Sequence, residues 1–175
     1  MFGLFKRSRK PTSTEKDEST ELLDELLAGF ALEDYLGPAA ERRHQALAAK
    51  KSAEFDLAWT ALQEVKDLYL KHALQCKFTA AQTLALDASV SPEMADILRL
   101  EGKHDDALVH ILYWVGSAVE PTETQRAKLR AYHRRSSLAP LPPSELEELL
   151  DRFRLKPDFR MLRDAVTGLR SKRDA

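Results

Sequence analysis

The sequence predicts an all-α fold built from antiparallel helical hairpins, and three observations support that prediction. Between Pro38 and Pro92 the chain contains no glycine and no proline, and alanine, leucine, lysine, glutamine and glutamate, which favour helix, are abundant. No segment shows the sustained alternation of β-branched and polar residues that marks a half-buried strand. Every proline can stand at a helix boundary, where its missing N–H group costs little.

Successive helices are predicted from the runs between these boundaries. From 21 to 36, leucines and aromatic residues recur every three or four positions, which predicts an amphipathic helix that ends at Gly37-Pro38. Further helices are expected at residues 39–52, 54–72, 77–87, 92–101, 104–118, 122–135, 144–155 and 158–171. Three of these starts have capping signals, which are Ser91 before Pro92, Thr122 with Gln125, and Ser144 with Glu147. The connections are short, so neighbouring helices should pack antiparallel.

Composition is typical of a globular protein. The chain has 175 residues, of which 43% are hydrophobic, and this excludes wholesale disorder. Twenty-seven basic and 28 acidic residues give a net charge of −1, so no charge excess indicates a nucleic-acid or membrane partner. The lone cysteine, Cys76, has no partner for an internal disulfide, which fits a reducing compartment. No apolar run approaches the ~20 residues of a membrane span, and we therefore expect a cytoplasmic protein.

We expect five segments along the chain. Residues 1–20 are predicted to be a disordered tail, because most of this stretch lacks large apolar side chains. The remaining segments are an amphipathic helix at 21–36, a helical domain at 38–137, a proline-rich linker at 138–143 and a C-terminal helical hairpin at 144–171. The helix and the hairpin both have apolar stripes, which either pack on the domain or dock on another protein. Exposed leucine stripes would also suit a homodimer.

The two central helical pairs repeat a pattern of residues, offset by the distance from Ala58 to Ala107. The matched positions are Ala46 and Ala95, Phe55 and His104, Ala58 and Ala107, Leu62 and Ile111, and Val65 and Trp114. This pattern resembles the tetratricopeptide repeat, a helix-turn-helix unit in which small residues let two helices cross closely. The resemblance covers residues 39–68 and 88–116. An extra helix near 78–87 separates the two units, and a generic antiparallel bundle would use the same residues.

The resemblance implies protein binding in a groove formed by stacked helix pairs. The candidate partner-binding residues are polar residues on or just after the first helix of each pair, namely Arg42, Gln45, Lys50, Arg99 and Lys103. The alternative for each is a solvated surface group. We expect a non-catalytic adaptor without a cofactor, whose partner is a peptide or helix of another protein. Charge reversal at Arg99 and Lys103 should then weaken partner capture without unfolding the domain.

Candidate catalytic or metal-binding groups are few. His72 and Cys76 are four residues apart and would supply two metal ligands from one helix face, but no third ligand is near in sequence. His104-Asp105 resembles the histidine–aspartate pair of helical metal phosphohydrolases, with His72 and Asp151 as further ligands, although an acidic first helical turn explains it better. The sequence contains no glycine-rich phosphate loop, serine-hydrolase elbow or dinucleotide fingerprint. We therefore predict no enzyme activity and no metal, with the phosphohydrolase as a third hypothesis.

A basic stripe supports a second hypothesis. Residues 126–135 contain five cations and no acid, and Arg126, Arg130 and Arg134 fall on one helix face. Together with the phenylalanine-rich N-terminal tip at 1–5, this stripe would suit a peripheral binder of nucleic acid or of an anionic membrane surface. The plainer explanation is a solvated helix that pairs with the acidic segment at 145–151.

Overall fold

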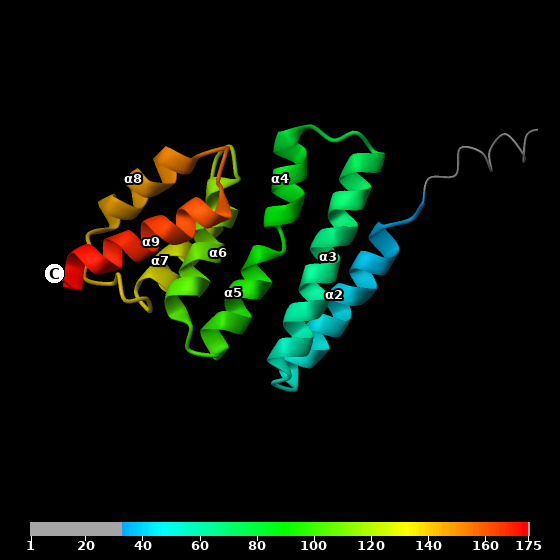
Figure 1. The fold of residues 1–175 in the computed structure, drawn as a ribbon, viewed down its shortest axis with the longest axis horizontal. Helices are drawn as coiled ribbons and strands as arrows, with labels where there is room; N and C mark the ends of the chain where they lie inside the picture. Colours follow the sequence, from blue (N-terminus) through cyan, green and yellow to red (C-terminus); the bar gives the residue numbers. More distant parts are fainter. Residues whose placement is uncertain (1–32, 175) are drawn as a thin grey trace, which may run out of the picture. The chain divides into compact units, whose positions relative to one another are not determined.

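The computed structural model describes residues 33–174, and all of the regular secondary structure in this range is helical. The helices are α2 (Leu36–Lys51), α3 (Phe55–Gln75), α4 (Ala80–Ala88), α5 (Ser91–Leu100), α6 (His104–Gly116), α7 (Glu123–His133), α8 (Pro143–Phe153) and α9 (Phe159–Asp174) (Figure 1). The all-α prediction is therefore confirmed for these residues. The predicted tail, and the predicted amphipathic helix up to residue 32, lie outside the described residues. From Asp34 onward the chain forms one compact unit.

Two predicted helix boundaries differ from the structure. Gly37-Pro38 lies in the first turn of α2 instead of ending a helix. The Asp34 carboxylate starts this turn by accepting hydrogen bonds from the backbone N–H groups of Leu36 (2.9 Å) and Gly37 (3.0 Å). Proline is tolerated there because N–H groups of a first turn have no helical partner. Ser91 does not cap α5, since the helix already includes it and the N-cap is Val90.

One of the two predicted capping boxes forms. Thr122 Oγ1 accepts a hydrogen bond from the Gln125 N–H group at 3.2 Å, and Gln125 Oε1 accepts one from the Thr122 N–H group at 2.8 Å. The box predicted at Ser144 is wrong, because α8 begins one residue earlier at Pro143. The N-cap of that helix is Pro142, whose side chain has no polar atom to satisfy the first N–H groups.

α2 packs along α3, and α5 packs along α6, as two helical pairs with similar turns. Each turn passes through a residue with positive φ, Ala53 (59°) in the first pair and Gly102 (78°) in the second. In both turns the next N–H group donates to a carbonyl five residues earlier, at 2.9 and 2.8 Å. The predicted close-packing alanines are all buried, namely Ala46, Ala58, Ala95 and Ala107. Membership of the tetratricopeptide family stays a prediction.

Two hydrophobic clusters fill the unit. One lies between α2, α3 and one face of α5, and the other centres on α6 and takes in residues of α5, α7, α8 and α9. Trp59 of α3 packs against both clusters and so connects them. α8 and α9 lie on α6 (Figure 1), where Phe153, Leu162 and Val166 are buried, so the C-terminal helices pack on the domain. Within the described range, no helix combines the length and apolar character that crossing a bilayer requires.

Candidate interaction groove

The helix α4 is apolar but largely uncovered. In its sequence, AAQTLALDA, Asp87 is the one charged residue, and Ala88 is the one residue that the fold buries fully. The other alanines of α4 are exposed and its two leucines are half-buried. Helices of soluble proteins normally cover their apolar side, and contiguous exposed apolar surface marks sites of interaction. The surface that α4 shares with its neighbours is therefore a candidate interaction site.

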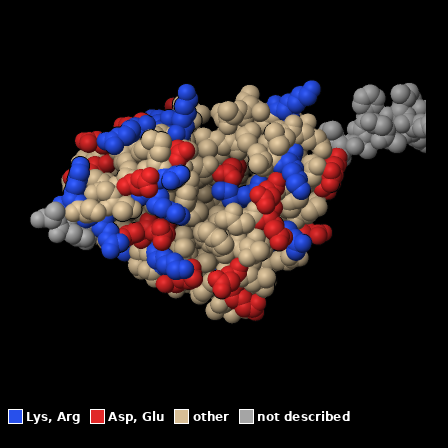
Figure 2. Space-filling view, in the orientation of Figure 1, with Lys and Arg blue, Asp and Glu red and all other residues tan. Residues whose placement is uncertain are grey.

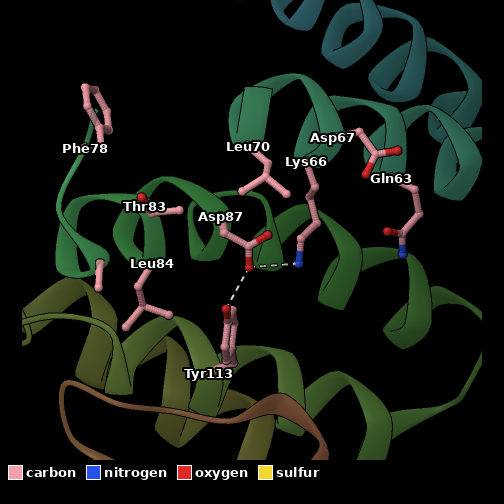
Figure 3. Close-up of a pocket in the computed structure, with 10 residues that line it drawn as sticks. Gln63, Lys66, Asp67, Leu70, Phe78, Thr83, Leu84, Asp87 and Tyr113 are labelled. Atoms are coloured by element: carbon pink, nitrogen blue, oxygen red, sulfur yellow. Dashed lines mark hydrogen bonds and ion pairs between the residues drawn. The ribbon is translucent and has the colours of Figure 1, made fainter. Parts of the chain in front are cut away.

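A groove of about 490 Å³ separates α4 from α3. Its lining comes from two rows of residues at helical spacing, which are Gln63, Lys66, Asp67 and Leu70 of α3 and Ala80, Thr83, Leu84 and Asp87 of α4. Phe78 closes one end and Gln63 lies at the other, with Tyr113 of α6 beneath them (Figure 3). Residues spaced i, i+3, i+4 and i+7 form one face of a helix, so two helix faces form the walls of the groove.

Polar groups at the floor of the groove satisfy one another. The Tyr113 hydroxyl donates to Asp87 Oδ2 at 2.7 Å, and Lys66 Nζ lies 3.1 Å from the same oxygen (Figure 3). Lys66 Nζ is also 5.6 Å from the centroid of the Tyr113 ring, within cation–π range. Burial, and then the hydrogen bond to Asp87, raise the pKa of Tyr113, so the phenol keeps its proton as a donor. These contacts hold α3, α4 and α6 together at the base of the groove.

His110 lies one helical turn before Tyr113, inside a cluster of aromatic rings. Its ring centroid is 5.6 Å from that of Trp59 and 4.6 Å from that of Phe159, and its side chain is only 6% exposed. Its Nδ1 atom is buried without a hydrogen-bond partner. Burial, and then the nearby charges of Lys66 and Arg163, lower the pKa of His110 to about 3. The imidazole is therefore neutral near pH 7 and packs as an aromatic ring.

The apolar surface continues beyond the groove along α3. Leu70, which lines the groove, is 50% exposed, and Leu74 one turn further on is 70% exposed. Both leucines lie on the C-terminal half of α3, beside the segment that leads into α4. The groove and these leucines together form an apolar surface that the described part of the fold leaves uncovered.

Two of the sequence-predicted partner-binding residues come together elsewhere, around Asp96 of α5. Lys50 Nζ lies 4.0 Å from Asp96 Oδ2, and Arg99 Nε lies 3.6 Å from Asp96 Oδ1. Lys128 of α7 is 3.7 Å from the same carboxylate, which also accepts a hydrogen bond from the Tyr132 hydroxyl. Asp96 therefore links α2, α5 and α7. Sequence spacing gave no signal for this cluster, because three separate helices contribute to it.

The other three predicted residues lie apart from that cluster. Arg42 Nη1 donates to Gln45 Oε1 at 2.8 Å, and Arg42 Nε is 2.7 Å from Glu64 Oε2. Arg42 and Gln45 line a separate hollow between α2 and α3. Lys103 pairs with Glu101 at 3.0 Å in the turn before α6. The five residues thus form no single site, and their role in partner binding stays a prediction.

The basic stripe is exposed but shares its surroundings with acidic groups. Arg130 pairs with Glu123 of the same helix, and Arg126 lines a shallow hollow together with Glu147 and Asp151 of α8. Arg134 follows the last residue of α7 and is exposed. On the face seen in Figure 2, acidic and basic side chains alternate over the described residues and gather into no patch of one sign. The acidic neighbours Glu123, Glu147 and Asp151 weaken the attraction of the stripe to phosphates.

The side chains predicted as possible metal ligands or catalytic groups lie in different surroundings. Cys76 Sγ is 3.8 Å from both ring nitrogens of His72. The Asp105 carboxylate accepts hydrogen bonds from the N–H and hydroxyl groups of Ser137, both at 2.7 Å. Among the described residues, no three histidine, cysteine or acidic side chains are grouped as metal ligands.

Comparison with protein-family models, curated proteins and solved structures found no match to this chain. The groove between α3 and α4 was also not among the sequence-predicted sites. One signal was available, because the extra helix separating the two repeat-like units is nearly free of charge. The functional interpretation therefore rests on the residues of this groove.

Proposed function

We propose that this protein is a non-catalytic interaction module whose α3–α4 groove binds a peptide or helix of a partner protein. The observation that supports this most directly is α4, an apolar helix with only Ala88 fully buried. Covering the side of α4 that lines the groove, together with Leu70 and Leu74, would remove apolar surface from water at a gain of about 25 cal/mol per Å². We propose binding and not catalysis for this groove, because the polar groups at its floor, Tyr113, Asp87 and Lys66, already pair with one another.

The shape of the groove favours a peptide segment over a compact small molecule. Gln63 and Leu70 are seven residues apart on α3, which corresponds to roughly 10 Å along the helix axis. The groove is therefore a trough about two helical turns long that is open along one side. Helix-in-groove recognition uses troughs of this kind, in which successive apolar side chains of one segment enter together.

The proposal is tested with three matched leucine variants of the immobilised full chain. Leu70→Asp puts a charge into the α3–α4 groove. Leu57→Asp alters another exposed leucine of α3, which lines the hollow with Arg42 and Gln45, and Leu100→Asp alters an exposed leucine on α5. Each bait is incubated with an extract of the source organism at low and moderate salt, and circular dichroism checks that each variant is folded.

The proposal expects one protein that is retained at moderate salt by the wild type, Leu57→Asp and Leu100→Asp, and is lost from Leu70→Asp. Loss from Leu57→Asp alone would move the site to the hollow beside Arg42 and contradict the α3–α4 groove. Retention that disappears between low and moderate salt in every bait would indicate phosphate-driven binding through the basic stripe instead. Equal retention by all four baits would also refute the groove.

A further inference from the structure

We infer that the segment bound in the α3–α4 groove is an amphipathic helix that places a lysine or arginine beside Asp67. This inference rests on the proposed function and adds the chemistry of the partner. It is supported by the two walls of the groove and by the pairing of the charges that line it (Figure 3).

The geometry of the two walls can accommodate a third helix packed between them. The α4 wall offers the small side chains Ala80 and Thr83, and the α3 wall offers Leu70 on the opposite side. Small residues on one wall leave room for large side chains of an incoming helix, which pack as ridges into the spaces between the rows. A helix with leucine-like residues at i, i+3, i+4 and i+7 matches both rows, because each of those rows has the same spacing.

The charges of the groove favour a basic neighbour. Lys66 and Asp87 neutralise each other across the floor at 3.1 Å. Asp67 is exposed on the α3 wall, and within the described part of the chain it forms no ion pair, not even with Lys71 one turn further along. The lining as a whole contains two carboxylates and one ammonium group, Lys66, so it has a net negative charge. A cation on the flank of the bound helix would complement Asp67, whereas an acidic residue there would be repelled.

Two designed helical peptides test the inference on the full-length protein. Both have leucines at i, i+3, i+4 and i+7, and they differ at the flanking positions, which are lysine in one peptide and glutamate in the other. Binding is followed by the amide shifts of the ¹⁵N-labelled chain, which report both the dissociation constant and the location of the contact. Leu70→Asp serves as the groove control, and Asp67→Lys serves as the charge control.

The lysine peptide is expected to shift amides of α3 and α4 and to bind about three- to ten-fold more tightly than the glutamate peptide, as attraction replaces repulsion at an exposed position. Asp67→Lys should reverse that order, and Leu70→Asp should weaken both peptides. Equal binding of the two peptides, with Leu70 still required, would overturn the charge inference and leave the groove intact. Absence of shifts in α3 and α4 with either peptide would overturn the helical occupant, whatever the extract experiment retains. Self-association abolished by Leu70→Asp would make a second copy of the chain the occupant and would also overturn it.

Discussion

Acidification from pH 7 to pH 5 should destabilise this protein through His110. In the folded chain, burial first, and then the charges of Lys66 and Arg163, lower the pKa of this imidazole from 6.5 to about 3. Between these two values the unfolded chain binds a proton that the folded chain does not, so the free energy of unfolding falls as the pH falls. Each pH unit in that window costs about 1.4 kcal/mol. Because the folded pKa of about 3 lies well below 5, lowering the pH from 6.5 to 5 costs about 2 kcal/mol of unfolding free energy.

Urea unfolding of the wild type and of His110→Phe at pH 7 and pH 5 measures this contribution. Phenylalanine keeps a ring against Trp59 and Phe159, and it removes an Nδ1 atom that has no hydrogen-bond partner. Any cost of fitting the larger ring is the same at both pH values, so it cancels in the comparison. The variant should lose about 2 kcal/mol less than the wild type on acidification. His44→Gln, at an exposed position of α2, is the control for replacing a histidine elsewhere in the chain. Equal losses in wild type and His110→Phe would refute the buried neutral imidazole.

Three further predictions concern the cap of α4, the packing of α5 on α6 and the floor of the groove, and the first two have a comparison variant. Thr79→Ala removes the capping box of α4 and should cost about 1 kcal/mol locally, seen as faster hydrogen exchange in α4 than elsewhere, whereas Thr122→Ala should speed exchange in α7. Ala107→Leu forces a larger side chain into a fully buried position between α5 and α6, and it should destabilise the fold by about 1–3 kcal/mol in thermal unfolding. Ala85→Leu, on the exposed side of α4, should leave the melting temperature nearly unchanged. Tyr113→Phe removes the hydrogen bond to Asp87 and should lower the free energy of unfolding by about 1–2 kcal/mol, measured with urea.

The helices could be predicted from the sequence because their boundaries are set by local chemistry. Thr122 and Gln125 lie three residues apart and can satisfy each other whatever the rest of the chain does. The predicted helix end at Gly37-Pro38 and the predicted N-cap at Ser144 were both wrong. In each case a neighbouring residue starts the helix at a position that the local rule does not anticipate. The Asp34 carboxylate accepts hydrogen bonds from the N–H groups of Leu36 and Gly37, so a helix begins where Gly37-Pro38 would ordinarily end one. At α8 the helix starts at Pro143, so Ser144 is already inside it.

The candidate groove could not be predicted, because it depends on how helices pack. The sequence shows that α4 is apolar, but an apolar helix of nine residues is equally compatible with a position in the core. Only the structure shows that α4 leaves Ala80, Ala81 and Ala85 exposed, and that Ala80 lines a groove whose opposite wall includes Leu70. Similarly, the sequence predicts Lys50 and Arg99 as separate groove residues, whereas in the structure both lie near the carboxylate of Asp96, in a network that spans three helices. The burial of His110 among rings from α3 and α9 also depends on how the helices pack, so the sequence does not predict it either.

The way in which α4 is held explains why its apolar side is available for binding. At its start, Thr79 and Gln82 satisfy the first N–H groups of the helix. At its end, Asp87 is fixed by Tyr113 and Lys66. These contacts are polar, and α4 is also held by the fully buried Ala88 and by Leu84, which packs against the cluster around α6. Since the contacts of Asp87, Ala88 and Leu84 position α4, its exposed alanines are not needed for packing within the fold. A partner can therefore cover them without displacing any contact on which the fold depends, which is the property that a docking surface requires.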